Sequence, residues 1–333
     1  MALSAAQRAR FAADGFLQVP NFLSAAELAP LKAELTEAVE DGARAARAQG
    51  RLSAAEFARS EGLPFESRLA ALCAALGEEP NHYPRLISGV MSKNNKSAAL
   101  FAVLTSPAVL NAVESVIGGE ILCHPQWNIR ASLPGDRGAP WHQVRALVPV
   151  PAHQAALTDP PHSPLLTCEL RGCKDINLLA PDCESTPMVN LWIPLIDTDE
   201  RSGCLRVARR SHSRGILPYD SGEIPHSALQ GLERVSCPTP AGGAVFLTQM
   251  LAHGSHDHLA EGLVRWSLDI RYSVLDMPTG RDEVPGFVAR SRRSPERVTK
   301  DAAAWRAAVE AVPGAEEVAN GVAAREMVRQ QRL

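Results

Sequence analysis

The chain has 333 residues, of which 45% are hydrophobic and 21% charged, and its formal net charge is -3. This balance is typical of a packed soluble protein, and it excludes a strongly basic nucleic-acid binder and a largely disordered chain. No apolar run approaches the ~20 residues that span a bilayer, and the first residues lack the apolar stretch of a secretory signal. Seven cysteines without a C-x-x-C pair indicate reduced thiols, so we expect a cytoplasmic protein.

Helices are predicted through the first third of the chain. Two S-A-A-E capping boxes, which begin at Ser24 and Ser53, each mark the start of a helix. Ser106, followed directly by proline, predicts a third helix that Gly118 ends. One more helical stretch is predicted near the C-terminus, at about 300–312.

Short strands are predicted from about residue 120 onward, where β-branched runs alternate with Gly, Pro and Asp turns. The predicted strands are 121–132, 188–195, 204–208, 234–237, 243–248 and 264–273. Such short strands without long helices between them favour an antiparallel sandwich or barrel. We therefore expect a single domain over 1–333, with a helical part at 1–119, a β core at 120–280 and a C-terminal extension at 281–333.

Residues 144–174 interrupt this pattern. The segment is rich in proline and follows neither the helical nor the strand period. Structureless loops of this length are uncommon inside a compact domain. The segment is therefore interpreted as an anomalous insert in the β core.

Several motifs occur in order in the β half: W-H-Q at Trp141, N-L-W-I-P-L-I-D at Asn190, S-G-C-L-R-V at Ser202, H-G-S at His253 and R-W-S-L-D-I-R-Y at Arg265. Each motif alone is weak, but their order and spacing together are specific. On these motifs the chain resembles the phytanoyl-CoA dioxygenase family of Fe(II)- and 2-oxoglutarate-dependent oxygenases. The resemblance implies a mainly β fold with flanking helices around a double-stranded β-helix, the jelly-roll or cupin-like core.

The resemblance also implies a metal site. The family holds Fe(II) with two histidines and one carboxylate, and supplies the first histidine and the acid as H-x-D. Matched to this sequence, the two histidines are His142 and His253. Arg265 matches the arginine that binds the distal carboxylate of 2-oxoglutarate. Ser267 lies two residues further on the same strand face, where its hydroxyl would add a hydrogen bond to that carboxylate.

The acid position of H-x-D is occupied by Val144, which cannot bind a metal. Three interpretations follow from this departure. The chain is a catalytically inactive β-helix that serves as a binding or scaffold protein, or it resembles the related halogenases, in which a small residue leaves room for chloride. In the third interpretation the acid is displaced, because removing 144–174 restores W-H-Q-D and the family spacing, with Asp175 as the carboxylate ligand.

The insert also has the boundaries of an intron. It begins with Val144, and every valine codon starts with GT; it ends with Lys174, and one lysine codon ends with AG. Its 31 residues correspond to 31 × 3 = 93 nucleotides, so read-through stays in frame. We hypothesise a retained intron, and we expect the 333-residue chain to bind iron more weakly than a 302-residue form (333 − 31).

Other polar and aromatic residues are assigned from their positions. Gln126, Asn128 and Arg130 alternate before W-H-Q, so they share one face, which either lines the pocket or meets solvent. Trp192 is expected in the core. His258, which lies close to the H-G-S motif, is expected in a solvated turn.

The resemblance implies a dioxygenase that hydroxylates a small organic substrate with dioxygen and releases succinate and carbon dioxide. Fe(II) is the expected cofactor and 2-oxoglutarate the expected co-substrate, with ascorbate as a candidate reductant. Neither nucleic acid nor a membrane is an expected partner.

Overall fold

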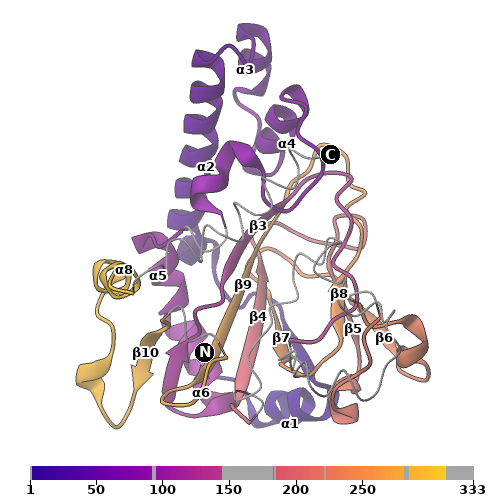
Figure 1. Cartoon of the computed structure of the whole chain (residues 1–333), viewed down its shortest axis with the longest axis vertical. Helices are drawn as coiled ribbons and strands as arrows, with labels where there is room; N and C mark the ends of the chain where they lie inside the picture. The colour runs from indigo at the N-terminus through magenta and orange to yellow at the C-terminus, as the bar shows by residue number, and fades with distance from the viewer. Residues whose placement is uncertain are drawn as a thin grey trace, which may run out of the picture.

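The structure is a computed structural model that describes residues 2–91, 95–144, 183, 185–220, 223–280 and 285–312. Within these residues two antiparallel sheets form the centre of the molecule (Figure 1). Apolar side chains of both sheets, among them Trp192 and Leu247 from one and Leu205 and Val207 from the other, share one buried cluster. The two sheets therefore face each other, as in the predicted jelly roll.

The larger sheet contains β1 (Phe16–Val19), β2 (Glu120–Cys123), β3 (Asn128–Ser132), β4 (Met188–Pro194), β7 (Ala244–Thr248), β9 (Arg265–Val274) and β10 (Phe287–Ser291). Its strand order is β1-β7-β4-β9-β2-β10, and β3 also pairs with β9. The smaller sheet contains β5 (Leu205–Ala208), β6 (Arg234–Cys237) and β8 (His253–Ser255), in the order β6-β5-β8. Each predicted strand region thus contains a strand.

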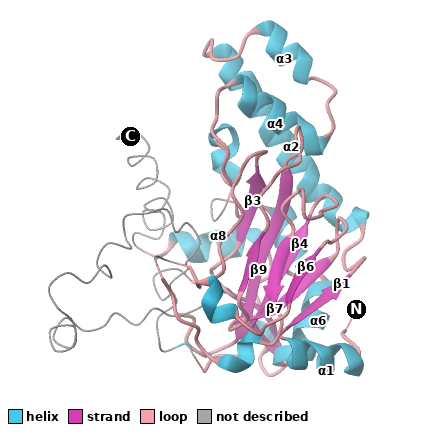
Figure 2. Cartoon of the chain, turned by 90° about the vertical axis from the view of Figure 1, so that its right-hand side faces the viewer, coloured by secondary structure: helices cyan, strands magenta, loops and turns pink. Residues whose placement is uncertain are grey.

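The longer helices are α1 (Ala5–Asp14), α2 (Ala25–Ala48), α3 (Ala54–Ser60), α4 (Phe65–Ala75), α5 (Ala98–Leu104), α6 (Pro107–Ile117) and α8 (Ala302–Glu310). Short 3-10 helices are η1 (Arg85–Val90), η5 (Ser211–Arg214), η6 (His226–Leu229) and η7 (Pro295–Arg297). The predicted capping boxes at Ser24 and Ser53 are both formed. In the side view, α2, α3 and α4 extend beyond one end of the sheets and α1 lies at the other end (Figure 2).

Strand β9 separates the helical layer from the space between the sheets. Trp266, Leu268 and Tyr272 on one face are buried in the large core cluster that includes the helices. Arg265 and Arg271 on the other face line a pocket. Successive residues of a strand point to opposite sides, so this one strand serves both the core and the pocket.

The strands differ from the expected pattern in two places. β1 lies in the part predicted as helical, and β10 lies in the part predicted as an extension. The predicted strand 121–132 is divided into β2 and β3, which pair with different halves of β9. Pro125, which has no N–H for a strand ladder, lies in the break between them.

Two smaller findings concern membranes and cysteines. No single helix among the described residues has both the length and the apolar character needed to span a bilayer, while α5 and α6 meet that criterion together as one bent pair. The five described cysteines are free and buried, in line with the prediction of reduced thiols. Of the insert 144–174 only Val144 belongs to the described residues, and Asp175 lies outside them.

Candidate functional site

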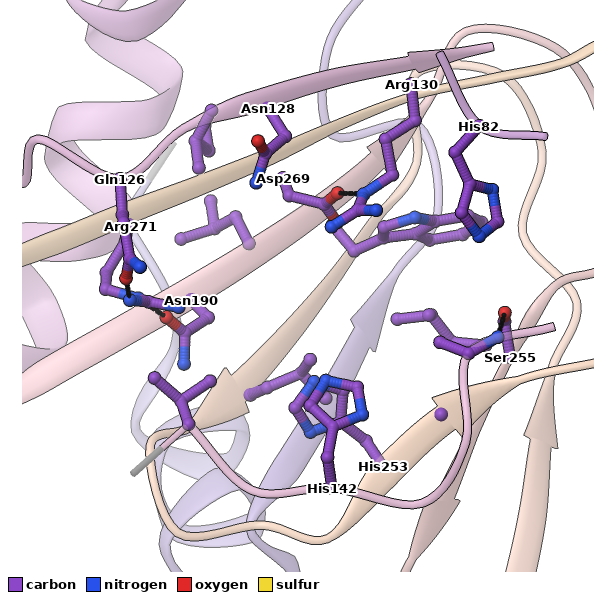
Figure 3. Close-up of a pocket in the computed structure, with 18 of the residues that line it drawn as sticks. His82, Gln126, Asn128, Arg130, His142, Asn190, His253, Ser255, Asp269 and Arg271 are labelled. Atoms are coloured by element: carbon purple, nitrogen blue, oxygen red, sulfur yellow. Dashed lines mark hydrogen bonds and ion pairs between the residues drawn. The ribbon is translucent and has the colours of Figure 1, made fainter. Parts of the chain in front are cut away.

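A cavity of ≈ 90 Å³ lies between the two sheets. Its wall comes from β3, β4 and β9 of the larger sheet, and from β5 and β8 of the smaller one (Figure 3). Gln126, Asn128 and Arg130 all line it, so the face that they share is the pocket face and not a solvated one. His142, His253 and Arg265, which the sequence placed in the site, line the same cavity; Ser267 belongs to the pocket face of β9 but not to the lining itself.

The two predicted metal-binding histidines lie next to each other. The backbones of His142 and His253 form an antiparallel bridge, in which each N–H donates to the carbonyl of the other, at 2.8 and 2.9 Å. The ring centroids are 4.2 Å apart. This pairing joins two segments that are far apart in the sequence, and it holds both imidazoles in the same part of the pocket (Figure 3).

Hydrogen bonds to backbone carbonyls also determine which ring nitrogen carries the proton in His142 and His253. Nδ1 of His142 lies 2.8 Å from the carbonyl oxygen of Pro140, and Nδ1 of His253 lies 2.9 Å from that of Leu251. A carbonyl oxygen only accepts, so Nδ1 is the donor in each case. The lone pair then resides on Nε2, which is the form of imidazole that binds a metal. The pair therefore fits two ligands of one metal ion.

The carboxylate that the resemblance implies beside the two histidines is not among the described residues. Val144 lines the pocket at the expected acid position and packs against Cys183 and Met188. In the described part of the chain, no group of three or more His, Cys, Asp and Glu side chains has the arrangement of a metal site. Asp175 falls in the range that the structure does not describe. The described residues thus include two imidazoles that fit metal ligands, without a carboxylate that completes such a site.

Arg265 and Ser267 form a second part of the site. Arg265 is 3% exposed, its Nη1 donates to the carbonyl of Gly203 at 2.7 Å, and its guanidinium carbon lies 5.9 Å from the centroid of the Trp192 ring. Ser267 is fully buried, and its Oγ has no hydrogen-bond partner among the described residues. A buried hydroxyl of this kind is costly unless a ligand satisfies it. A guanidinium beside such a hydroxyl fits a bound carboxylate.

A buried polar network lies behind Arg265. His258 is 1% exposed and donates from Nδ1 to the carbonyl of Ser132 at 3.0 Å, so the prediction of a solvated turn is wrong. Burial, and after it the positive charge of Arg265, lower the pKa of His258 to about 4. Asp136 accepts from the hydroxyl of Ser132 at 2.8 Å and lies 2.5 Å from Nδ1 of His82. The imidazole of His258 is therefore neutral at neutral pH.

A third group of polar residues was recognised only in part from the sequence, which pointed to Gln126 and Arg130 but not to Asn190, Asp269 or Arg271. Arg271 donates to the side-chain oxygens of Asn190 and Gln126, and Arg130 pairs with Asp269. All of these residues line the pocket. The signal that was available is the alternation R-x-S-x-D-x-R in β9, which places Asp269 and Arg271 on the same face as Arg265.

Known proteins resemble the chain at the level of family and fold. The Phytanoyl-CoA dioxygenase (PhyH) family matches residues 11–265. The structure resembles that of SnoK, a non-heme alpha ketoglutarate dependent carbocyclase from nogalamycin biosynthesis, at 16% identity and a TM-score of 0.52, covering 84% of this chain and 88% of that one. It also resembles apo ThoJ, a non-heme monooxygenase, at 20% identity and a TM-score of 0.51, covering 96% and 99%.

No curated protein matches the chain. At identities this low, the two solved structures show a shared fold, which is the jelly roll that the sequence predicted. The family match covers most of the chain and includes both histidines and Arg265. The chain belongs to the phytanoyl-CoA dioxygenase family.

Proposed function

We propose that this protein is an Fe(II)- and 2-oxoglutarate-dependent dioxygenase that hydroxylates a small organic substrate. The observation that carries the proposal is the backbone bridge between His142 and His253, with the Nδ1 atoms of both rings tied to carbonyls in one pocket. Arg265 lines that pocket too. The printed descriptions of SnoK and ThoJ, an alpha ketoglutarate dependent enzyme and a non-heme monooxygenase, support the same class of chemistry.

We assign the metal to His142, His253 and Asp175. Two imidazoles and one carboxylate on one face are the usual ligands of non-haem Fe(II) in oxygenases. Asp175 is chosen because it follows His142-Gln143 directly once residues 144–174 are removed. Its assignment rests on the sequence, since Asp175 is not among the described residues.

The side chains around the metal position have separate tasks. When bound, Fe(II) would activate dioxygen, which is the oxidant, and 2-oxoglutarate would supply two electrons and leave as succinate and carbon dioxide. Arg265 binds the distal carboxylate of 2-oxoglutarate through its planar guanidinium, and the hydroxyl of Ser267 donates to the same group. Leu191 and Leu247 also line the cavity, and their apolar side chains help to exclude water from it.

Val144 supports two other candidate functions. A valine in the pocket at the acid position matches a halogenase-like site, in which chloride would take the place of the carboxylate. The same residue also fits an inactive jelly roll that binds a ligand without turnover. Both candidates require that Asp175 does not reach the metal.

Anaerobic titration separates the three candidates. Fe(II) is added to the full chain, followed by 2-oxoglutarate, and the visible charge-transfer band of the complex is recorded. We expect the band in the unmodified chain and in His226→Ala, a control for the exposed histidine on η6. We expect its loss in His253→Ala and a strong reduction in Asp175→Ala.

Other outcomes have definite meanings. No band in the unmodified chain contradicts the dioxygenase and leaves the inactive binding protein. An unchanged band in Asp175→Ala, with a product that requires chloride, favours the halogenase. Substrate-triggered succinate formation that persists in His253→Ala would refute the metal assignment.

The retained-intron hypothesis has its own test. A form without residues 144–174 is expected to bind Fe(II) more tightly than the full chain, because the ends of a long insert must otherwise be brought together at the metal. Equal affinities in the two forms contradict this expectation. Spliced transcripts that all keep the corresponding 31 × 3 = 93 nucleotides contradict the intron itself.

A further inference from the structure

His82 lies beside β3, at the edge of the larger sheet. Its carbonyl accepts from the N–H of Ala131 at 3.1 Å, and the carbonyl of Asn81 accepts from the N–H of Leu133 at 3.1 Å. Strand β9 pairs with the other side of β3. Neighbouring strands lie about 4.8 Å apart, so the backbone of His82 is roughly 10 Å from that of β9, which carries Arg265. His82 therefore reaches the pocket from the edge of the sheet.

A carboxylate holds the ring of His82. Nδ1 of His82 lies 2.5 Å from Oδ2 of Asp136, and each of the two residues is 8% exposed. Oδ2 of Asp136 also accepts from the hydroxyl of Ser132 at 2.8 Å. A carboxylate only accepts hydrogen bonds, so Nδ1 of His82 carries a proton. The contact thus fixes both the orientation of the ring and the place of this proton.

Asp136 is ionised in this arrangement. Burial acts to raise the pKa of its carboxyl group, but the hydrogen bonds from His82 and Ser132 and the charge of Arg265 lower it below its usual value. A buried carboxylate must be desolvated, so a pair of this kind is weak evidence for a purely structural role. An imidazole that a carboxylate orients at the wall of a cleft is a candidate functional group.

The other nitrogen of the ring faces the cavity. Nδ1 of His82 is inaccessible, whereas the residue as a whole is partly accessible and lines the cavity. The accessible edge of the ring is therefore the opposite one, which carries Nε2. In the described part of the chain, no hydrogen bond uses this Nε2. Figure 3 shows His82 on the side of the pocket opposite to His142 and His253.

The chemistry of imidazole selects the ligand group that suits this position. Nε2 accepts a hydrogen bond when the ring is neutral and donates one when the ring is protonated. An ether or carbonyl oxygen suits only the protonated ring, and an ammonium group suits only the neutral one. A hydroxyl group both donates and accepts, so it suits Nε2 of His82 in either state.

We propose that Nε2 of His82 binds a hydroxyl group of the substrate, so that the enzyme acts on an alcohol or a phenol. This inference rests on the proposed oxygenase function for what happens to that molecule. Asp136 is a positioning residue, because it acts through the ring of His82. Leu191, Leu205 and other apolar residues of the lining would contact the rest of the molecule.

Pairs of molecules that differ in the hydroxyl group test the proposal. Phenol and cyclohexanol are titrated into the full chain by calorimetry and compared with fluorobenzene and fluorocyclohexane, first without metal and then anaerobically with Fe(II) and 2-oxoglutarate. We expect each hydroxyl compound to bind about fivefold more tightly than its fluoro analogue, which corresponds to one hydrogen bond. Equal affinities in both pairs, or no binding of the hydroxyl compounds, overturn the proposal.

Two variants locate the effect. His82→Phe keeps a ring of similar shape but removes both nitrogens, and the preference for the hydroxyl compound should disappear. His258→Asn is the matched control, because His258 is a buried histidine of the same network that does not line the cavity. This control should keep the preference. A preference that persists in His82→Phe, or that both variants lose equally, would show that the hydroxyl group binds elsewhere.

Nitrogen-15 spectra of the histidine side chains observe the ring directly. The signal of Nε2 of His82 in the metal-free chain is identified by its absence from His82→Phe or, if that variant does not fold, from His82→Gln. We expect phenol to shift this signal and fluorobenzene to leave it unchanged. In Asp136→Asn the proton is no longer confined to Nδ1, so both nitrogen signals of His82 should change. Phenol that binds without shifting the Nε2 signal would refute the contact.

Competition with the co-substrate provides the last arm. Phenol should bind equally well when 2-oxoglutarate saturates the iron-loaded chain, and its displacement would place phenol at Arg265 and overturn the proposal. The metal-free titrations do not depend on iron. A failed iron titration with a retained hydroxyl preference would therefore remove the oxygenase function and keep the site at His82. A normal iron titration without that preference would remove only the site at His82.

Discussion

The two faces of β9 have opposite chemistry within one strand. Toward the helices, Trp266 is fully buried and stacks on the ring of Phe65 at 4.9 Å between centroids. Toward the pocket, Arg265 is almost as deeply buried and yet carries a charge and a network of polar neighbours. Similar burial thus has two different consequences: on one face it stabilises the fold, and on the other it places polar groups such as the hydroxyl of Ser267 beside the pocket.

A substitution on the face of β9 that packs against the helices should have the largest effect on stability. Trp266→Ala is expected to lower the free energy of unfolding by about 3–5 kcal/mol, because it removes a large buried side chain and leaves a cavity. Urea denaturation followed by circular dichroism measures this. Leu259→Ala is the control, since Leu259 is 60% exposed and should change stability by less than about 0.5 kcal/mol. If both variants lost a similar amount of unfolding free energy, the helix-side face of β9 would not have the special role in stability that we assign to it.

The buried polar network that includes His258 should make the stability of the fold depend on pH. The folded chain holds His258 neutral down to a pKa of about 4, whereas an unfolded histidine takes up a proton below about 6.5. The unfolded state therefore binds more protons between these values, and the free energy of unfolding falls as pH drops through that window, by about 3 kcal/mol.

Urea titrations at pH 7, 5.5 and 4.5 measure the slope of the free energy of unfolding against pH. In His258→Asn the amide Nδ2 replaces the Nδ1 donor to Ser132 but does not titrate, so the slope over this window should become smaller. Asp136, whose carboxyl group has a lowered pKa, loses its contribution only at more acidic pH, below about 3.8. A slope that is unchanged in His258→Asn would show that another group is responsible.

On the face of β9 that lines the pocket, a substitution should change the affinity for 2-oxoglutarate more than it changes the stability of the fold. Arg265→Lys keeps the charge but loses the planar fork, and we expect 2-oxoglutarate to bind 10- to 100-fold more weakly, about 1.5–3 kcal/mol. The anaerobic 2-oxoglutarate titration measures the affinity, and urea denaturation shows whether stability follows it. A variant that loses stability but binds 2-oxoglutarate normally would assign Arg265 to the core.

The smallest effect is expected at Ser267. Because its Oγ has no partner among the described residues, Ser267→Ala should leave the unfolding free energy of the metal-free chain unchanged or slightly higher. Binding of 2-oxoglutarate should weaken about fivefold, which corresponds to one hydrogen bond of about 1 kcal/mol. Unchanged binding would show that the hydroxyl does not reach the co-substrate.

Local sequence signals predicted most of the elements. The capping boxes at Ser24 and Ser53 depend on residues three positions apart, and both are present in the structure. β1 was missed because its four residues gain their strand conformation from pairing with β7, as in the register of Phe16 with Leu247. Such a pairing has no local signal in the sequence.

The site residues also divide into those with a local sequence signal and those that only distant contacts bring together. His142 and His253 were found because each lies in a motif, and the structure brings them together. Gln126 was named as a candidate for the pocket face, but its grouping with Asn190 and Arg271 was missed, because the three residues come from separate segments and Asn190 lies in the otherwise apolar strand β4. Only the packing of the sheet shows that these polar groups belong together.

The backbone bridge between His142 and His253 has a consequence for metal selectivity. It positions both rings through main-chain contacts that involve no residue of the insert 144–174. Two imidazoles without an oxygen ligand favour copper, nickel and zinc over ferrous iron, as the Irving–Williams series describes. Where the acid is out of reach, we therefore expect the two imidazoles to take up nickel, copper or zinc in preference to ferrous iron, so the ion bound would depend on which metals are supplied.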